Sequence, residues 1–178
     1  MHHVLSRLIP RPQEIDLLDG HFDWGEEVIV LVEPDNEDDR FAVQTLEDAC
    51  RERSIAVPHV IASAEIAEAS QCRRIIAGDP ASHWPLFKAM QSAGLALPPQ
   101  TVDCGYMLHI SPERILLASH TREGVYYGIQ TLVQLLPRKK EKSVRALKIA
   151  DWTLIRHRGF SMDLYSGEVY DQEMMKET

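Results

Sequence analysis

Short apolar runs with the spacing of β-strands mark the first half of the chain. Val28–Val32 is an uninterrupted run rich in β-branched residues, which is typical of a strand covered on both faces. Residues 60–62 and 74–78 have the same character and predict two further strands. Segments 14–18 and 21–24 flank an Asp-Gly pair, so they predict a hairpin with a two-residue turn.

Three longer segments carry the periodicity of helices. Acidic residues open the segment 35–52, where the helix dipole favours negative charge, and apolar positions follow at spacings of three and four. Residues 82–93 predict a second helix that carries Trp84, Leu86, Phe87 and Met90, and Trp84 falls at a position expected to be buried. A third helix is predicted over 122–136, with Thr121 as its N-cap. Its core-facing stripe consists of Val125, Ile129, Leu132, Val133 and Leu136.

The second half adds more strands. Residues 102–110 and 114–119 predict a hairpin around Ser111-Pro112-Glu113, and residues 146–152 predict a last strand. Hairpin-linked strands combined with a few helices indicate an α+β fold: a mixed, mostly antiparallel sheet with helices packed on one face. Strict alternation of strand and helix holds only over 28–78, so a three-layer α/β fold is the alternative.

Gly124 and Gly128 stand four residues apart inside the third predicted helix. Each lowers helix propensity by about 1 kcal/mol relative to alanine. This loss is explained if another element passes close to that face of the helix. Tyr126, Tyr127 and Gln130 nearby are expected to pack, with their polar ends at the edge.

Composition narrows the possible partners. The chain has 178 residues with 44% apolar and 26% charged residues, which predicts a folded globular domain. A formal charge of −8 argues against binding to nucleic acid or to anionic membranes, because both require positive surfaces. No apolar run reaches the length of a membrane span or of a signal peptide. We therefore expect a cytoplasmic location, or a secreted one if a signal sequence was removed.

Reactive groups are scattered rather than clustered. Cys50, Cys72 and Cys104 are widely spaced and odd in number, which predicts reduced structural thiols. His120 has no second ligand at metal-binding spacing and is expected in a loop. The chain lacks motifs for a zinc protease, a nucleophile elbow and a phosphate loop, so it predicts no catalytic residue, no metal site and no cofactor.

Arg158 and Asp163 are the two candidate binding residues. A guanidinium at a strand end donates two hydrogen bonds in a fixed fork, which suits adjacent sugar hydroxyls or a carboxylate. Residues five apart on a regular strand point to opposite faces, so only one of the two would face a given pocket. An ion pair that ties the strand to its neighbours is the structural alternative.

Several segments together resemble family 20 of the glycoside hydrolases, the β-N-acetylhexosaminidases. The resemblance is carried by the opening Ile-Pro-Arg-Pro-Gln phrase (9–13), the strands at 106–110 and 115–118, the helix Gly-Val-Tyr-Tyr-Gly (124–128), and Arg-Gly-Phe-Ser-Met-Asp (158–163). The glycine-tyrosine helix also occurs in the related O-GlcNAcases, whereas Asp163 favours family 20. A departure lies at Ser166, where family members often carry an arginine.

The resemblance implies a non-catalytic accessory domain over 1–152, similar to domain 2 of the family, and a truncated start of the catalytic (β/α)8 barrel over 153–178. The partner would be the protein's own barrel. The parent enzyme would hydrolyse terminal N-acetylhexosamine residues by substrate-assisted catalysis, with Arg158 and Asp163 in the amino-sugar subsite. The acid-base residues would lie farther along the barrel, so the fragment itself is expected to be inactive.

Two alternatives remain open. One is an accessory domain of an O-GlcNAcase-like hydrolase. The other is a carbohydrate-binding module that holds sugar on exposed aromatic side chains. Trp24, Trp84 and Trp152 are its candidates, although Trp24 and Trp84 fall at positions that predict burial.

Overall fold

The computed structural model describes residues 8–25, 28–32, 37–62, 73–138, 141–155 and 159, with backbone only for 37–39 and 62. Most of the predicted barrel start over 153–178 lies outside these residues. The elements in chain order are β1 (Glu14–Asp23), β2 (Val28–Val32), α1 (Glu37–Arg53), β3 (His59–Ala62), β4 (Arg73–Gly78), α2 (Trp84–Ser92), the 3-10 helix η3 (Pro99–Val102), β5 (Tyr106–Ile110), β6 (Arg114–Ala118), α3 (Arg122–Leu135) and β7 (Ser143–Asp151).

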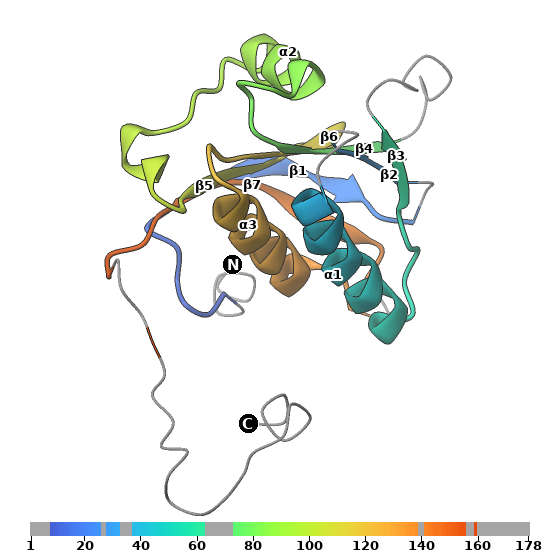
Figure 1. Ribbon diagram of the computed structural model, residues 1–178. Helices are drawn as coiled ribbons and strands as arrows, with labels where there is room; N and C mark the ends of the chain where they lie inside the picture. Colours follow the sequence, from blue (N-terminus) through green and yellow to red (C-terminus); the bar gives the residue numbers. More distant parts are fainter. Residues whose placement is uncertain are drawn as a thin grey trace, which may run out of the picture.

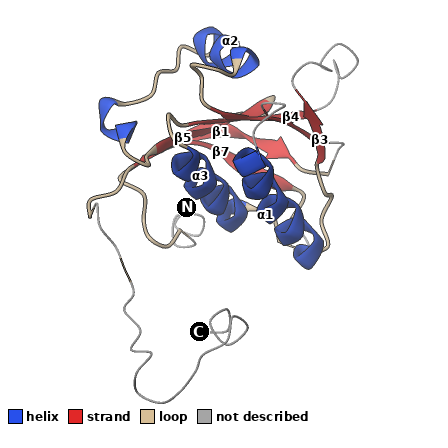
Figure 2. Cartoon of the chain, viewed as in Figure 1, coloured by secondary structure: helices blue, strands red, loops and turns tan. Residues whose placement is uncertain are grey.

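The strands form one mixed sheet in the order β1-β7-β5-β6-β4-β2-β3. The pairings β1·β7, β7·β5 and β5·β6 are antiparallel, and β6·β4, β4·β2 and β2·β3 are parallel. The α+β class and the mixed sheet are thus confirmed, with antiparallel and parallel pairings in equal number. Helices α1 and α3 cover one face, as expected, but α2 lies on the opposite face (Figures 1 and 2).

The sheet separates two hydrophobic cores. The larger lies under α1 and α3 and includes Val30, Leu46 and Ile129, while the smaller lies under α2 and includes Ile29 and Leu86. Because successive strand residues point to opposite faces, the β2 run contributes to both cores. All five residues of β2 are buried, which confirms a strand covered on both faces.

Helix α3 packs very closely on the sheet. A Cβ at Gly124 would lie closer than 3.0 Å to Ser119 and to the backbone of Gly105, and one at Gly128 would meet Leu117. The glycines therefore allow the close approach that their positions predicted. Thr121 caps the helix by accepting a hydrogen bond from the Gly124 amide at 3.1 Å.

The predicted hairpin at Asp19-Gly20 is wrong. Residues 14–23 form one strand, because β7 pairs with both halves: Glu14 lies opposite Ala150 and Asp23 opposite Ser143. The register shifts between Leu17 and His21, and Gly20 has φ +95°. The glycine thus forms a bulge within a strand, where left-handed backbone is needed, rather than a turn between two strands.

The expected burial of Trp84 is also wrong. The buried residues of α2 are Leu86, Ala89 and Met90, at spacings of three and one, and they define the face that packs on the sheet. Trp84 and Phe87 lie off this face, and they are 61% and 40% exposed. Trp24, in contrast, is buried, and its indole N–H donates to the carbonyl of Ala56 at 2.9 Å.

Candidate functional site

A cavity of about 480 Å³ opens where the chain leaves β7. It is bounded by four segments: the residues preceding β1, residues 104–106 at the start of β5, one side of α3, and residues 151–155. We call it the junction pocket; its lining includes Ile9, Gln13, Tyr127, Gln134, Asp151 and Leu154. Segments from both ends of the domain therefore meet in one place.

Asp151 is the centre of the pocket's polar contacts. Its Oδ1 accepts a hydrogen bond from the Gln13 amide at 3.1 Å, and its Oδ2 lies 3.4 Å from the Tyr106 hydroxyl. That hydroxyl is also 2.6 Å from Thr131 Oγ1 on α3. The carboxylate thus joins the segment before β1, the strand β5 and, through Tyr106, helix α3.

Burial changes the acidity of two members of this network. Desolvation raises the pKa of Asp151, although the amides of Gln13 and Trp152 oppose the shift by donating to the carboxylate. Desolvation also raises the pKa of Tyr106, against the opposing effect of its hydrogen bond with Thr131. Tyr106 therefore stays protonated at neutral pH and acts as a hydrogen-bond donor.

A second contact ties the N-terminal segment to α3. The Gln134 side chain accepts from the Ile9 amide at 2.8 Å and donates to the Ile9 carbonyl at 3.2 Å. This reciprocal pair holds the backbone of the N-terminal segment along the last turns of the helix. One wall of the junction pocket is therefore fixed by hydrogen bonds at both Ile9 and Gln13.

Exposed apolar side chains gather around the junction pocket. Within the described residues nine large apolar side chains are exposed, and four of them line the pocket. Ile9 is 77%, Leu154 75% and Ile155 66% exposed, and Tyr127 joins them from α3. Such a cluster of exposed apolar groups beside polar ones is typical of an interaction surface. We call these four residues the junction surface.

Tyr126, Tyr127 and Gln130 were expected to pack rather than to line a pocket. Tyr126 does pack, against the large core and against the ring of Phe41 at 6.0 Å between centroids. Tyr127 and Gln130 line the junction pocket instead, and this part of the prediction is wrong. The stripe at three- and four-residue spacing identified the buried face correctly, but it could not show that a second segment borders the opposite face.

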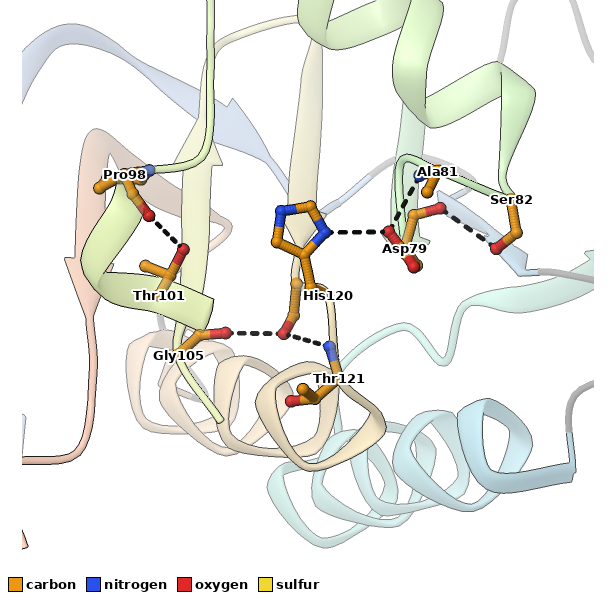
Figure 3. Close-up of polar contacts among 9 residues, drawn as sticks. Asp79, Ala81, Ser82, Pro98, Thr101, Gly105, His120 and Thr121 are labelled. Atoms are coloured by element: carbon orange, nitrogen blue, oxygen red, sulfur yellow. Dashed lines mark hydrogen bonds and ion pairs between the residues drawn. The ribbon is translucent and has the colours of Figure 1, made fainter. Parts of the chain in front are cut away.

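His120 lies in a loop after β6, as predicted, but a carboxylate is close to it. Its Nδ1 is 3.3 Å from Oδ1 of Asp79, which follows β4 (Figure 3). Sequence reasoning missed this pair because 41 residues separate its members, and only the parallel pairing of β4 and β6 brings them together. Among the described residues no three His, Cys, Asp or Glu side chains form a group able to hold a metal ion.

The cysteines described by the structure are free thiols. Cys50 is buried in α1, and burial raises its pKa to about 12. Cys104 lies at the junction pocket, and Cys72 is outside the described residues. The two predicted binding residues, Arg158 and Asp163, also fall outside the described residues. No helix in the described part of the chain is long and apolar enough to cross a membrane.

Comparison with known proteins gives one family match. The family described as glycosyl hydrolase family 20, domain 2, matches residues 5–152. Its match covers the whole sheet and ends one residue after β7.

Solved structures share the fold at low identity. CpGH84D superposes with a TM-score of 0.77 at 18% identity, covering 96% of this chain and 27% of that one. A chitobiase from Flavobacterium johnsoniae gives 0.59 at 17%, covering 89% and 22%. A family 20 exo-β-N-acetylglucosaminidase from Vibrio harveyi, solved with N-acetylglucosamine, gives 0.55 at 20%, covering 88% and 20%. The chain therefore spans roughly a quarter or less of the length of these structures.

Proposed function

The chain belongs to the domain 2 family of glycosyl hydrolase family 20, and we propose that it is the non-catalytic accessory domain of a β-N-acetylhexosaminidase-like enzyme. Its role is to support the catalytic barrel of that enzyme. The observation that carries this role is the junction surface, because exposed apolar side chains surround the point where the chain leaves the sheet. A folded domain that follows β7 would cover them.

The proposed domain boundary lies directly after the last strand. Residues 1–152 form the accessory domain in this proposal, and residues 153–178 begin the barrel. The family match supports the first limit, since it ends at residue 152. Leu154 and Ile155 then belong to the connection, and their exposure suits side chains that pack against the barrel.

The polar network gives the connection a defined direction. Asp151 is the last residue of β7, and its carboxylate is bonded to the segment before β1. A chain that leaves from such a fixed point starts in one orientation, which lowers the conformational entropy lost when two domains dock. We propose that Asp151 positions the barrel in this way without touching substrate.

The parent enzyme in this proposal removes terminal N-acetylhexosamine residues. Its chemistry would be substrate-assisted, with the acetamido oxygen of the sugar as nucleophile and a carboxylic acid as proton donor. The acid-base residues belong to the barrel. We propose that Arg158 and Asp163 bind the amino sugar there. Replacing Arg158 by lysine in the parent enzyme would then raise KM, because a lysine cannot reproduce the two hydrogen bonds that a guanidinium donates in a fixed fork.

A first test uses the 178-residue chain alone. Incubation with 4-nitrophenyl N-acetyl-β-D-glucosaminide should release no nitrophenol above a buffer control. Turnover that stays with the chain through successive purification steps would overturn the accessory role.

A second test uses the chain together with its proposed barrel. Leu154→Asp would place a charge where the two domains meet, so it should lower the melting temperature of the barrel. Val60→Asp is the matched control, because Val60 is an exposed apolar residue on the edge strand β3, away from the junction pocket. Equal effects of the two substitutions would refute the docking role of the junction surface.

A further inference from the structure

The connections that follow two neighbouring strands diverge at one edge of the sheet. Strands β4 and β6 are adjacent and parallel, so their carboxyl ends lie side by side. The helix after β4, α2, covers one face of the sheet, and the helix after β6, α3, covers the other (Figure 1). Where connections diverge in this way, a crevice opens outside the strand ends, and open sheets with parallel strands bind their ligands there.

A groove of about 340 Å³ starts at this point. Pro80 and His120 border it beside the strand ends, and residues of α2 and of the segment after it form its length. Its apolar lining consists of Phe87, Met90, Leu95, Ala96 and Leu97, with the Gln91 amide beside them. The volume lies at the lower end of the range of about 300–1,000 Å³ found for small-ligand sites.

Polar groups stand at the strand end of the groove. Asp79 Oδ1 accepts from the Ala81 amide at 2.9 Å and lies 3.3 Å from His120 Nδ1, so the turn and the imidazole fix the carboxylate (Figure 3). Both contacts use the same oxygen. Asp79 thereby holds His120, which borders the groove, and the other ring nitrogen of this imidazole can form a hydrogen bond with a hydroxyl.

Aromatic rings stand at the α2 side of the groove. Phe87 lines it, and Trp84 stacks on Phe87 with 5.5 Å between ring centroids and 20° between planes. The Lys88 ammonium lies 5.1 Å from the Trp84 centroid. A cation–π contact at an exposed site is weak, so a ligand can displace the lysine. The two rings form a stacked aromatic platform, in which Phe87 lines the groove next to the hydrogen-bonding groups and Trp84 supports it.

We propose that this groove binds a neutral sugar, with the C–H face of the pyranose ring on Phe87 and its hydroxyls at His120 and Gln91; Asp79 positions His120, and Trp84 supports Phe87. A pyranose has one apolar face and a polar rim, which is the combination that the groove presents. The carboxylate of Asp79 disfavours phosphates and other anions, which often occupy such crevices. The groove shares no lining residue with the junction pocket, so the inference does not depend on the proposed barrel.

Binding to the full 178-residue chain tests the proposal. ¹⁵N-labelled protein is titrated with N-acetylglucosamine, with its β-1,4-linked dimer and with inorganic phosphate, and amide shifts are followed by NMR. We expect saturable shifts with the sugars at residues of the groove and none there with phosphate. Phe87→Ala and Asp79→Asn should each weaken sugar binding roughly tenfold, which corresponds to about 1.4 kcal/mol.

Phe41→Ala is the matched control. Phe41 is an exposed helical aromatic that stacks on a neighbouring ring, but it lies on α1, on the other face of the sheet. It should leave the sugar affinity unchanged. Overlay of the variant spectra with the wild type, away from the substituted site, establishes that each variant is folded.

Three results would overturn the proposal. The first is the absence of saturable shifts with either sugar. The second is sugar binding that Phe87→Ala and Asp79→Asn do not weaken more than Phe41→Ala does. The third is concentration-dependent self-association in the ultracentrifuge that Trp84→Ala abolishes, because the platform would then be a protein interface.

Discussion

Replacing Gly124 by alanine separates two opposing contributions to stability. Helix propensity alone predicts that Gly124→Ala stabilises α3 by about 1 kcal/mol. Contact geometry predicts the opposite, because the new methyl group would lie closer than 3.0 Å to Ser119 and to the carbonyl oxygen of Gly105. The Ser119 hydroxyl donates to that same carbonyl at 2.6 Å, so the substitution also disturbs a buried hydrogen bond.

The sizes of these contributions decide whether Gly124→Ala stabilises or destabilises the domain. A misfitting methyl group in a packed interior costs about 1–3 kcal/mol, and a lost hydrogen bond about 1 kcal/mol more. Together they exceed the gain in propensity, and we expect a net destabilisation of about 1–3 kcal/mol. For a chain of this length each kcal/mol lowers the melting temperature by about 2–4 °C.

Urea unfolding followed by far-UV circular dichroism measures the effect directly. Glu123→Ala on the exposed side of the same turn is the control, and it should change the free energy of unfolding by less than about 1 kcal/mol. Adding Ser119→Ala to Gly124→Ala removes the Ser119 hydroxyl from the contact. This double variant should not regain the full stability of the wild type, because the backbone of Gly105 remains in place. A Gly124→Ala variant as stable as the wild type would refute the close packing of α3 on the sheet.

Three further predictions concern the core and the pocket. Ile129→Ala should lower the free energy of unfolding by about 2–5 kcal/mol in a urea titration, because Ile129 is fully buried; a change below about 1 kcal/mol would place it on the wrong face. The pKa of Asp151 in the folded state is raised above its ordinary value of 3.8, so the protonated carboxyl favours folding. The free energy of unfolding of the wild type, relative to that of Asp151→Asn, should therefore fall as the pH rises from the ordinary pKa to the folded-state pKa. Parallel pH profiles of the two proteins in calorimetry would contradict this. In a variant with Cys72 and Cys104 replaced by serine, Cys50, which is buried and has its pKa raised to about 12, should react with Ellman's reagent only after unfolding, whereas reaction in the native state would show that α1 opens.

Patterns that depend on local spacing could be read from the sequence. The β2 run, the Thr121 cap and the buried stripe with Ile129 are confirmed, because burial on one or both faces of an element leaves a repeat in the sequence. The Gly124 and Gly128 pair was informative for the same reason. Each glycine lowers the helix propensity of its segment, and only another element packed close to the helix explains its presence there.

Features that depend on distant partners could not be read in this way. Asp19-Gly20 has the residues of a turn, but pairing with the long strand β7 converts it into a bulge. Trp84 is apolar and helical, yet the sheet contacts the adjacent face of α2. The pairing of His120 with Asp79 depends on which strands become neighbours, and the sequence spacing carries no sign of it.

The same dependence explains why the junction pocket joins the two ends of the domain. Strand β7 pairs with β1 on both sides of the bulge, and Ala150 lies opposite Glu14, so the residue that ends β7 lies beside the residue that precedes β1. Asp151 and Gln13, 138 positions apart, are therefore brought into contact by sheet register, and the carboxylate needs only to accept one amide. A domain that follows residue 152 would then press on the N-terminal segment as well as on α3. For this reason the Gln134→Ala variant, which releases Ile9 from α3, should weaken docking of the barrel even though Gln134 is far from residue 152 in sequence.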